Sequence, residues 1–331
     1  MPNSLPMHSA SRIPAPLVES AAERLVSVPA RARRAAARQL IEAAPAHGID
    51  LSLLWGVVDW SASPPRVAQV CLLVPTSGRT AMVYVSGQDD APSAADPATQ
   101  HHNRVDAITA AFAEVDEHLS DRIRLCQTLV SPRETWSLTA CLEAGMQEVA
   151  QLDYLRLRLD LAHHEAVEGA MPSGVRVRPI GDLKIPAERD TLARALERSY
   201  IDTLDCPALC GMRETGDVIQ SHLSTGQHDP ALWWVIELDD QPEGALLLSP
   251  FPDQRLVELV YVGWSPVLRG RGLGGILMSR AIASARRTGA VEMTCAVDMR
   301  NEPALRLYDR FGFVPIDHRH ALVRPTLETA R

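Results

Sequence analysis

Apolar positions in the second half of the chain follow two spacings, one typical of helices and the other typical of strands. Residues 188–204 place Leu192, Leu196 and Tyr200 on one helical face, and residues 215–226 predict a second helix. The other predicted elements are strands at 175–180, 231–240, 244–251, 257–266, 291–297 and 320–326, and helices at 274–289 and 300–313. This order of elements predicts a mixed α/β sheet flanked by helices.

The first half of the chain repeats part of this order. Residues 124–130 form a strand-like run, residues 131–146 a helix-like segment, and residues 152–159 another strand. Aligning Gly145 with Gly312 matches two strand–helix–glycine–strand units at an offset of 167 residues. The same alignment pairs Glu134 with Asn301, Cys141 with Tyr308, and Met146 with Phe313. Chance similarity of two α/β units is the alternative, but the matched order favours an internal duplication.

The duplication predicts two tandem domains joined by a polar linker. Residues 163–174 contain Pro172 and Gly174 and precede a new strand, as expected of a domain boundary. We therefore expect a flexible N-terminal tail, a first domain, the linker and a second domain, at residues 1–19, 20–162, 163–174 and 175–331. Each domain is expected to be an α/β (α+β) fold with a mixed, mostly antiparallel sheet flanked by helices.

Composition and charge narrow the class of protein. Of 331 residues, 46% are apolar and 22% are charged, which is typical of a globular chain with a substantial core. The net charge of −8 argues against nucleic-acid binding. No apolar run approaches the roughly 18 residues of a membrane span, and the first 20 residues lack the pattern of a secretory signal. The arginine-rich stretch 24–38 resembles a transit peptide but is better explained as a basic helix.

Cysteines and histidines predict no metal site. The six cysteines are scattered, several within apolar runs, so we expect reduced and mostly buried thiols in a cytoplasmic protein. Cys206 and Cys210 form a lone pair, which is weak evidence for zinc without a second pair. Four histidines lack the spacing of metal ligands and are expected to be surface or packing residues: His222, His228, His318 and His320.

The sequence RGRGLGG at 269–275 follows a predicted strand and opens a helix, an arrangement that binds phosphate. It satisfies the dinucleotide pattern GxGxxG, and Glu292 lies near the position of a ribose-binding acid. However, Glu292 begins its strand, and only 39 residues follow it, too few for a doubly wound sheet. A nucleoside triphosphate loop is excluded because no Gly-Lys-Ser/Thr follows. The third candidate is the pyrophosphate of coenzyme A.

The pattern Arg269-x-x-Gly272-x-Gly274 resembles the acetyl-CoA loop of the GNAT superfamily of N-acetyltransferases. Downstream, residues 301–313 resemble the second signature of that family, in which an Asn leads to a Tyr and then to Gly-Phe. The strand and turn at 258–266 resemble the GNAT segment whose backbone pairs with pantetheine. Two signatures in the family's order are far more specific than either alone.

The resemblance covers residues 175–325. Residues 20–160 resemble a GNAT repeat that lacks the acetyl-CoA loop, with Cys141 in place of Tyr308. A tandem arrangement with an active C-terminal half resembles the mycothiol synthase group in architecture, which by itself specifies no substrate. The resemblance implies acetyl-CoA as co-substrate. The residues it implies as acetyl-CoA contacts are Val260, Val262, Gly263, Trp264, Arg269, Gly270, Arg271, Gly272, Leu273, Gly274, Gly275, Asn301 and Ala304.

The resemblance also implies two catalytic residues. Glu258 is expected to accept the amine proton, directly or through water, and Tyr308 to protonate the leaving thiolate. Each has a structural alternative. In the alternative for Glu258, this residue faces solvent because Leu259 and Tyr261 share the opposite face of the strand. In the alternative for Tyr308, the ring is an ordinary packing aromatic. Asn301 is equally consistent with a helix cap and with a cofactor contact.

The acceptor is expected beside the two helices that precede the sheet, around Tyr200, Asp202, Asp205 and Cys206, although helix-surface charge explains these acids equally well. We therefore expect acetyl-CoA-dependent N-acetylation of a primary amine of a small molecule. The enzyme is expected to be a monomer or homodimer without nucleic-acid or membrane partners and without a metal. The alternatives are acetylation of a protein N-terminus or lysine, and a non-catalytic acyl-CoA-binding sensor.

Overall fold

A computed structural model describes residues 10–89, 94–160 and 170–327. Contacts divide the chain into two compact units. The first comprises residues 1–148 and 320–331, and the second comprises Val149–Arg319. None of the helices in the described ranges is both long and apolar enough to span a membrane.

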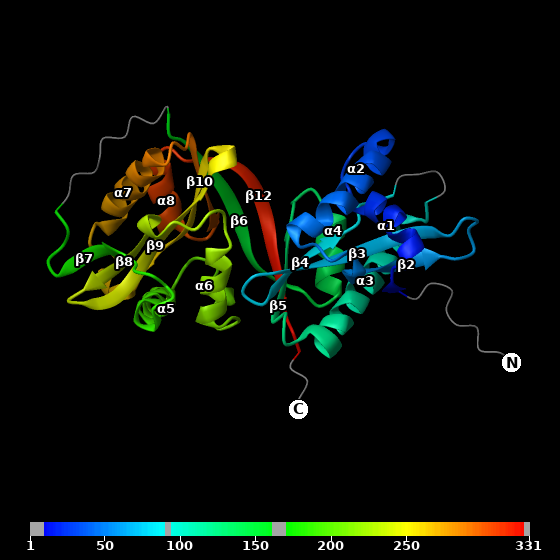
Figure 1. The fold of residues 1–331 in the computed structure, drawn as a ribbon, viewed down its shortest axis with the longest axis horizontal. Coiled ribbons are helices and arrows are strands. Elements are labelled where there is room, and N and C mark those ends of the chain that lie inside the picture. Colours follow the sequence, from blue (N-terminus) through cyan, green and yellow to red (C-terminus); the bar gives the residue numbers. More distant parts are fainter. Residues whose placement is uncertain (1–9, 90–93, 161–169, 328–331) are drawn as a thin grey trace. The chain divides into compact units, whose positions relative to one another are not determined.

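The second unit is built on a mixed sheet with strand order β6-β11-β10-β9-β8-β7 (Figure 1). Its strands are β6 (Gln147–Arg158, of which 149–158 belong here), β7 (Val175–Pro179), β8 (Trp233–Leu238), β9 (Gln241–Phe251), β10 (Leu256–Trp264) and β11 (Glu292–Asp298). Its helices are α5 (Pro186–Tyr200), α6 (Thr215–Leu223), α7 (Leu273–Arg287) and α8 (Glu302–Arg310). Neighbouring strands are antiparallel except β10 and β11. The mixed α/β fold predicted from the sequence is therefore confirmed.

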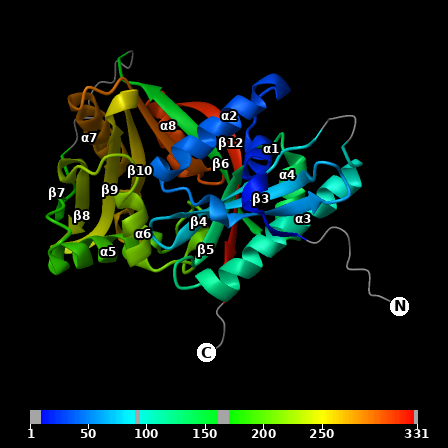
Figure 2. The ribbon, with the colours of Figure 1, turned by 45° about the vertical axis from the view of Figure 1, so that its right-hand side comes forward.

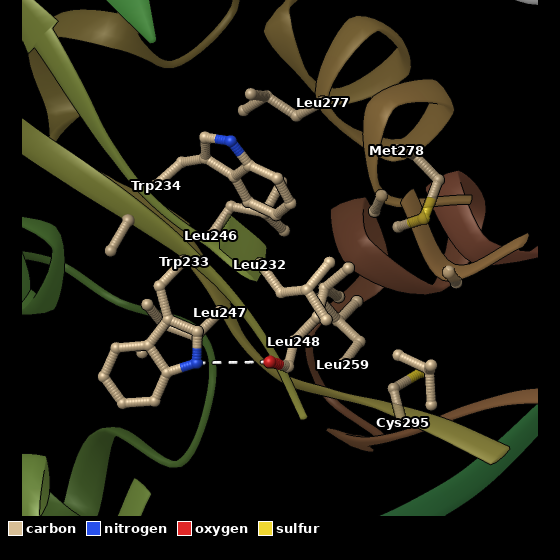
Figure 3. Packing of buried hydrophobic residues seen from close by; sticks show 14 of the residues in the cluster. Leu232, Trp233, Trp234, Leu246, Leu247, Leu248, Leu259, Leu277, Met278 and Cys295 are labelled. Carbon is tan, nitrogen blue, oxygen red and sulfur yellow. Dashed lines mark hydrogen bonds between the residues drawn. The ribbon is translucent and has the colours of Figure 1, made fainter. Parts of the chain in front are cut away.

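Helices cover both faces of this sheet, with α5 and α6 on one side and α7 and α8 on the other (Figures 1 and 2). The central strands β8 and β9 are almost wholly buried, as expected for strands covered on both faces. Trp234 packs toward Leu277 and Met278 of α7, whereas Trp233 lies on the opposite face (Figure 3). The Trp233 Nε1 donates a 3.1 Å hydrogen bond to the Leu248 carbonyl, so its buried polar atom is satisfied.

Strands β10 and β11 separate after a short parallel contact. They pair at three positions, from Leu256–Glu292 to Glu258–Thr294. Beyond this point β10 continues to Trp264 paired only with β9, and β11 continues to Asp298 paired with β6. Within the described residues the two strands share no further pairs. One edge of β10 over residues 259–264 is therefore open to a ligand.

The first unit has the same arrangement of strands. Its order is β1-β2-β3-β4-β5-β12, and only β4 and β5 are parallel, again over three pairs. The strands are β1 (Ser11–Arg12), β2 (Leu54–Asp59), β3 (Arg66–Thr76), β4 (Thr80–Val85), β5 (Leu125–Val130) and residues 320–325 of β12 (Val314–Pro325). The helices are α1 (Val18–Leu25), α2 (Ala30–Ala43), α3 (Pro97–Glu114) and α4 (Thr135–Glu143). Alternate residues of β3 belong to two separate clusters, one beside α1 and one beside α3 and α4.

Helices α4 and α8 begin and end with the same local geometry. Each ends before a glycine in the left-handed region, Gly145 with φ of 92° and Gly312 with φ of 79°. In each helix the residue after the glycine donates back across the turn. Met146 N lies 3.0 Å from Cys141 O, and Phe313 N lies 3.1 Å from Tyr308 O. Glu134 and Asn301 occupy the two N-cap positions. These matches support the internal duplication.

The N-terminus of α3 is capped by a carboxylate of the chain itself. Asp96 Oδ1 accepts hydrogen bonds of 3.0 Å from both Ala98 N and Thr99 N. A helix N-terminus attracts anions because its first N–H groups lack helical partners and its dipole is positive there. In the first unit the side chain of Asp96 already occupies this position.

Arg104 of α3 is buried beside the end of β4. The residue is 1% exposed, and its Nε donates a 3.3 Å hydrogen bond to the Ser86 carbonyl. The guanidinium carbon lies 4.5 Å from the centre of a Trp136 ring on α4. Burial, followed by the charge of Arg24, lowers the pKa of Arg104 to about 10. The space between β4, α3 and α4 is thus occupied by side chains of the unit itself.

The division of the chain differs from the expected boundaries. Residues 149–158 belong to the second unit, where residues 152–158 pair with β11, whereas residues 320–325 pair with β5 and belong to the first. Strand pairing causes the difference, because it assigns each segment to the sheet that its backbone completes. Residues 10–19, expected in the tail, include β1 and the start of α1. Residues 1–9, and residues 161–169 around and within the expected linker, lie outside the described ranges.

Candidate functional site

A cavity of about 600 Å³ lies in the second unit where β10 and β11 separate. Its wall combines the loop after α5, the end of β10, the glycine turn, β11 and the first turns of α8. The lining residues are Ser199, Tyr200, Asp202, Thr203, Leu204, Asp205, Tyr261, Val262, Gly263, Trp264, Arg269, Gly270, Gly274, Val297, Asn301, Pro303, Ala304, Leu307 and Tyr308. The volume lies within the range of small-ligand sites.

The glycine turn forms a main-chain site for an anion. Gly270 and Gly272 adopt φ of 74° and 79°, a conformation that side-chain-bearing residues rarely adopt. Gly272 is the N-cap of α7, and no side chain caps this end of the helix. The first N–H groups of α7 are therefore available to an external oxyanion, in contrast to those of α3.

Gly274 allows α7 to approach α8 closely. A Cβ built on Gly274 would lie 3.2 Å from Leu307 Cδ2 and 3.7 Å from Trp264 Cη2. The first contact is tighter than ordinary van der Waals packing, so a side chain at this position would require Leu307 to shift by a few tenths of an ångström. The glycine keeps Trp264, the turn and α8 together around one end of the cavity.

A β-bulge at Val260 decides which way the side chains of β10 point. Leu259 pairs with Leu248 and Tyr261 with Leu247, so Leu259 and Tyr261 lie on opposite faces of the sheet. The expectation that these two residues share a face is wrong, because the extra residue shifts the alternation. Glu258 lies on the same face as Tyr261, the face covered by α5 and α6. Tyr261 reaches α5 there, with its hydroxyl 2.5 Å from Ser199 Oγ.

Glu258 is the last residue of β10 that is paired on both sides, opposite Ser249 and Thr294. Burial raises the pKa of its carboxyl group. Its charge acts on Tyr154 of β6 and on Cys295 of β11. Glu258 does not line the cavity itself and lies at the point where the strands separate.

Tyr308 of α8 lines the cavity and is also part of the core. It is 5% exposed, and its ring centre lies 5.4 Å from that of Phe313. Its side chain is hydrogen-bonded to Cys295, and burial raises the pKa of Tyr308 well above the ordinary value. The hydroxyl is therefore a protonated group in an apolar wall.

Asp205 connects the loop after α5 to β11 and α8. Its Oδ1 accepts a 2.9 Å hydrogen bond from Asp298 N, and Asp298 Oδ2 accepts one of 3.2 Å from Cys206 N. Asn301 also hydrogen-bonds the Asp205 side chain and caps α8 by accepting from Ala304 N at 3.3 Å. Burial raises the pKa of Asp205. Asn301 is thus a helix cap that also faces the cavity.

The side chain of Arg269 binds protein carbonyls. Its guanidinium donates to the Ile201, Asp202 and Ser199 oxygens at 2.6, 2.8 and 3.2 Å. These carbonyls lie at the C-terminal end of α5, where the helix dipole is negative. Arg271, by contrast, is exposed.

A family comparison matches this site. The sequence model of the acetyltransferase (GNAT) family matches residues 198–313, which include every residue of the cavity wall. This segment is similar to the GNAT family. The resemblance inferred from the two sequence signatures is thereby confirmed.

Curated relatives of this chain carry the name mycothiol acetyltransferase. The protein from Beutenbergia cavernae is 29% identical over 184 residues, 52% of this chain and 58% of that protein. The protein from Streptomyces coelicolor is 26% identical over 163 residues, 48% of this chain and 49% of that protein. The chain therefore spans about half the length of the curated relatives that it matches.

A solved structure shows the same fold over the whole chain. The GCN5-related N-acetyltransferase from Sphaerobacter thermophilus aligns with a TM-score of 0.57 and 19% identity, covering 98% of this chain and 99% of that one. At this identity the likeness concerns the fold alone.

The GNAT cavity brings together most of the residues that the sequence suggested. Those on its wall are Tyr200, Asp202, Asp205, Val262, Gly263, Trp264, Arg269, Gly270, Gly274, Asn301, Ala304 and Tyr308. Those outside the wall are Glu258, Val260, Arg271, Gly272, Leu273 and Gly275. In the described ranges no three His, Cys, Asp or Glu side chains are grouped to hold a metal ion.

Several wall residues were not predicted: Ser199, Thr203, Leu204, Tyr261, Val297, Pro303 and Leu307. Tyr261 shows why. A Cβ on Gly263 would lie 2.6 Å from the Tyr261 hydroxyl, so the ring folds back over this glycine. The tyrosine two residues before a strand glycine is the signal in the sequence that could have identified it.

Proposed function

We propose that the second unit transfers an acetyl group from acetyl-CoA to a primary amine of a small molecule. The observation that carries this proposal is a single cavity formed by the separating strands, the uncapped glycine turn and Tyr308. Acetyl-CoA supplies the activated thioester. The names of the curated relatives support a small-molecule acceptor.

The glycine turn and the end of β10 hold the co-substrate in this proposal. Main-chain N–H groups from Gly270 to Gly275 receive the pyrophosphate, because the turn and the start of α7 direct them outward. The open edge of β10 at Val262–Trp264 pairs with the pantetheine amides, and an N–H there stabilises the thioester oxyanion. Asn301 and Ala304, at the start of α8, line the same cavity.

Glu258 and Tyr308 move the protons. Glu258 accepts a proton from the attacking amine through water, since it lies beside the cavity wall and not on it. A carboxyl whose pKa is raised by burial is a better base near neutral pH than an exposed one. Tyr308, which its raised pKa keeps protonated until the thiolate forms, then donates its proton to the departing thiolate. Tyr200, Asp202 and Asp205, which line the cavity, receive the cationic amine in this proposal.

The test is release of free thiol from acetyl-CoA with a panel of amines, read by a thiol reagent and by mass spectrometry of the product. Acetylation of a small amine with loss of turnover in both Tyr308→Phe and Glu258→Gln supports the proposal. Unchanged turnover in both variants refutes the mechanism. Acetylation of peptides alone identifies a protein acetyltransferase. Binding of acetyl-CoA without thiol release from any acceptor identifies a sensor.

A further inference from the structure

The loop after α5 forms the acceptor side of the cavity and has an unfavourable backbone conformation. Within this acceptor loop, residues 201–206, Asp202 and Cys206 adopt φ of 50° and 46°. Non-glycine residues rarely occupy the left-handed region and do so where surrounding contacts impose it. Asp202, Thr203, Leu204 and Asp205 all line the cavity. The shape of the acceptor side therefore depends on what fastens this loop.

The acceptor loop is fastened at both ends. At its far end, the Asp205 carboxylate accepts a hydrogen bond from Asp298 N, and the Asp298 carboxylate accepts one from Cys206 N. At its near end, the Arg269 guanidinium donates to three carbonyl groups of the helix terminus and loop, those of Ser199, Ile201 and Asp202. A planar guanidinium can satisfy several oxygens at once, which a lysine ammonium on a flexible stem cannot reproduce.

Arg269 also begins the turn that receives the anion. Its main chain leads directly into Gly270 and Gly272, while its side chain points to the acceptor loop. Arg269 therefore contributes its main chain to the anion-binding turn and its side chain to the contacts with the acceptor loop. Fixing the turn around a pyrophosphate fixes the base of the Arg269 side chain, and with it the carbonyls of residues 199–202.

We propose that Arg269 is a positioning residue for the acceptor and acts by holding the acceptor loop, not by binding the pyrophosphate through its side chain. The inference rests on the proposed acetyltransferase function of the cavity. It implies that coenzyme A binding stabilises the acceptor loop through Arg269. Acceptor affinity then depends on whether the cofactor turn is occupied.

Hydrogen exchange tests the coupling without any acceptor. Arg269→Gln removes the charge, Arg269→Lys keeps it, and Arg271→Gln alters an exposed arginine of the same turn. With free coenzyme A bound, we expect the amides of residues 201–206 to exchange about tenfold faster in both Arg269 variants than in wild type or Arg271→Gln. Equal protection in wild type and Arg269→Lys overturns the inference. Thermal melts check folding, and Arg269→Lys alone carries the test if Arg269→Gln fails to fold.

Steady-state kinetics separates positioning from phosphate binding. We expect Arg269→Lys to raise the KM for the amine about tenfold while changing the KM for acetyl-CoA less than about threefold, and Arg271→Gln to do the reverse. A raised KM for acetyl-CoA with an unchanged amine KM in Arg269→Lys refutes the inference. If no amine is ever acetylated, the proposed function fails while the exchange experiment still decides the role of Arg269.

Discussion

At the scale of single residues, the hydroxyl group of Tyr308 is what distinguishes a catalytic acid from a packing aromatic. Tyr308 fills the core beside Phe313, and its hydroxyl meets Cys295 at the cavity. We expect Tyr308→Phe to keep the packing and to lower kcat by about 10²–10⁴-fold, the usual contribution of a general acid. Acetyl-CoA affinity should stay within about twofold, as measured by calorimetry. An unchanged kcat would leave Tyr308 a packing residue.

Two glycines of α7 offer a matched pair for testing the anion site. Gly272 before α7 and Gly289 after it have φ of 79° and 81°, and a Cβ on either would meet no atom within 4 Å. Alanine at each should therefore cost a similar amount of stability, about 1–2 kcal/mol. Only Gly272→Ala should weaken acetyl-CoA binding, by about tenfold or more, because only this residue lies in the anion-binding turn. Equal affinity of both variants for acetyl-CoA would contradict the proposed anion-binding turn.

Glu258 links activity to stability. Burial raises the folded pKa of its carboxyl above the ordinary 4.5, so the native state holds this proton more tightly than the unfolded state. Stability must then fall as pH rises from the unfolded pKa through the folded one. Glu258→Gln lacks this loss, so its Tm relative to wild type should increase between pH 4.5 and 7.5 while its turnover drops. A pH-independent difference in Tm would contradict the buried, titrating carboxyl.

At the scale of elements, β6 is indispensable to the second unit. It pairs with β11 from Leu152 to Arg158, and Leu155 and Leu157 are buried in the core of this unit. We expect a fragment of residues 175–331, the domain predicted from the sequence, to be insoluble or unfolded, because it leaves β11 as an apolar edge. A fragment of residues 149–319 should fold better and bind coenzyme A. Circular dichroism and thermal melts of both would show this, and a well-folded 175–331 fragment would contradict it.

The sequence predicted most of these elements because their apolar spacing and glycine positions are local signals. The helix ends at Gly145 and Gly312, and the turn at Gly270–Gly275, follow from single residues. The bulge at Val260 has no such signal, so the direction of Glu258 was not predictable. The pairing of β6 with β11 depends on contacts distant in sequence, and so does the bond from Arg269 to the end of α5. Local patterns specify neither.

At the scale of the whole molecule, the two units differ at equivalent helix N-termini, that of α7 in the second unit and that of α3 in the first. The second leaves the start of α7 to an external anion, whereas the first fills the start of α3 with Asp96 and the adjoining space with Arg104. We therefore expect one acetyl-CoA per chain, measured by calorimetry and native mass spectrometry. Binding of two would contradict this. Gly272→Ala should abolish most of the binding, which would assign the single site to the second unit.

The open edge of β10 has a consequence for the free protein. Main-chain groups without a strand partner are a template on which another chain can add a strand. A ligand that pairs with this edge also removes the template, and saturation at about 100 times Kd adds about 2.7 kcal/mol to the free energy of unfolding. Preparations stripped of coenzyme A should therefore aggregate at lower concentration and lower temperature than saturated ones. If the proposed binding is correct, the co-substrate protects this strand against aggregation as well as supplying the acetyl group.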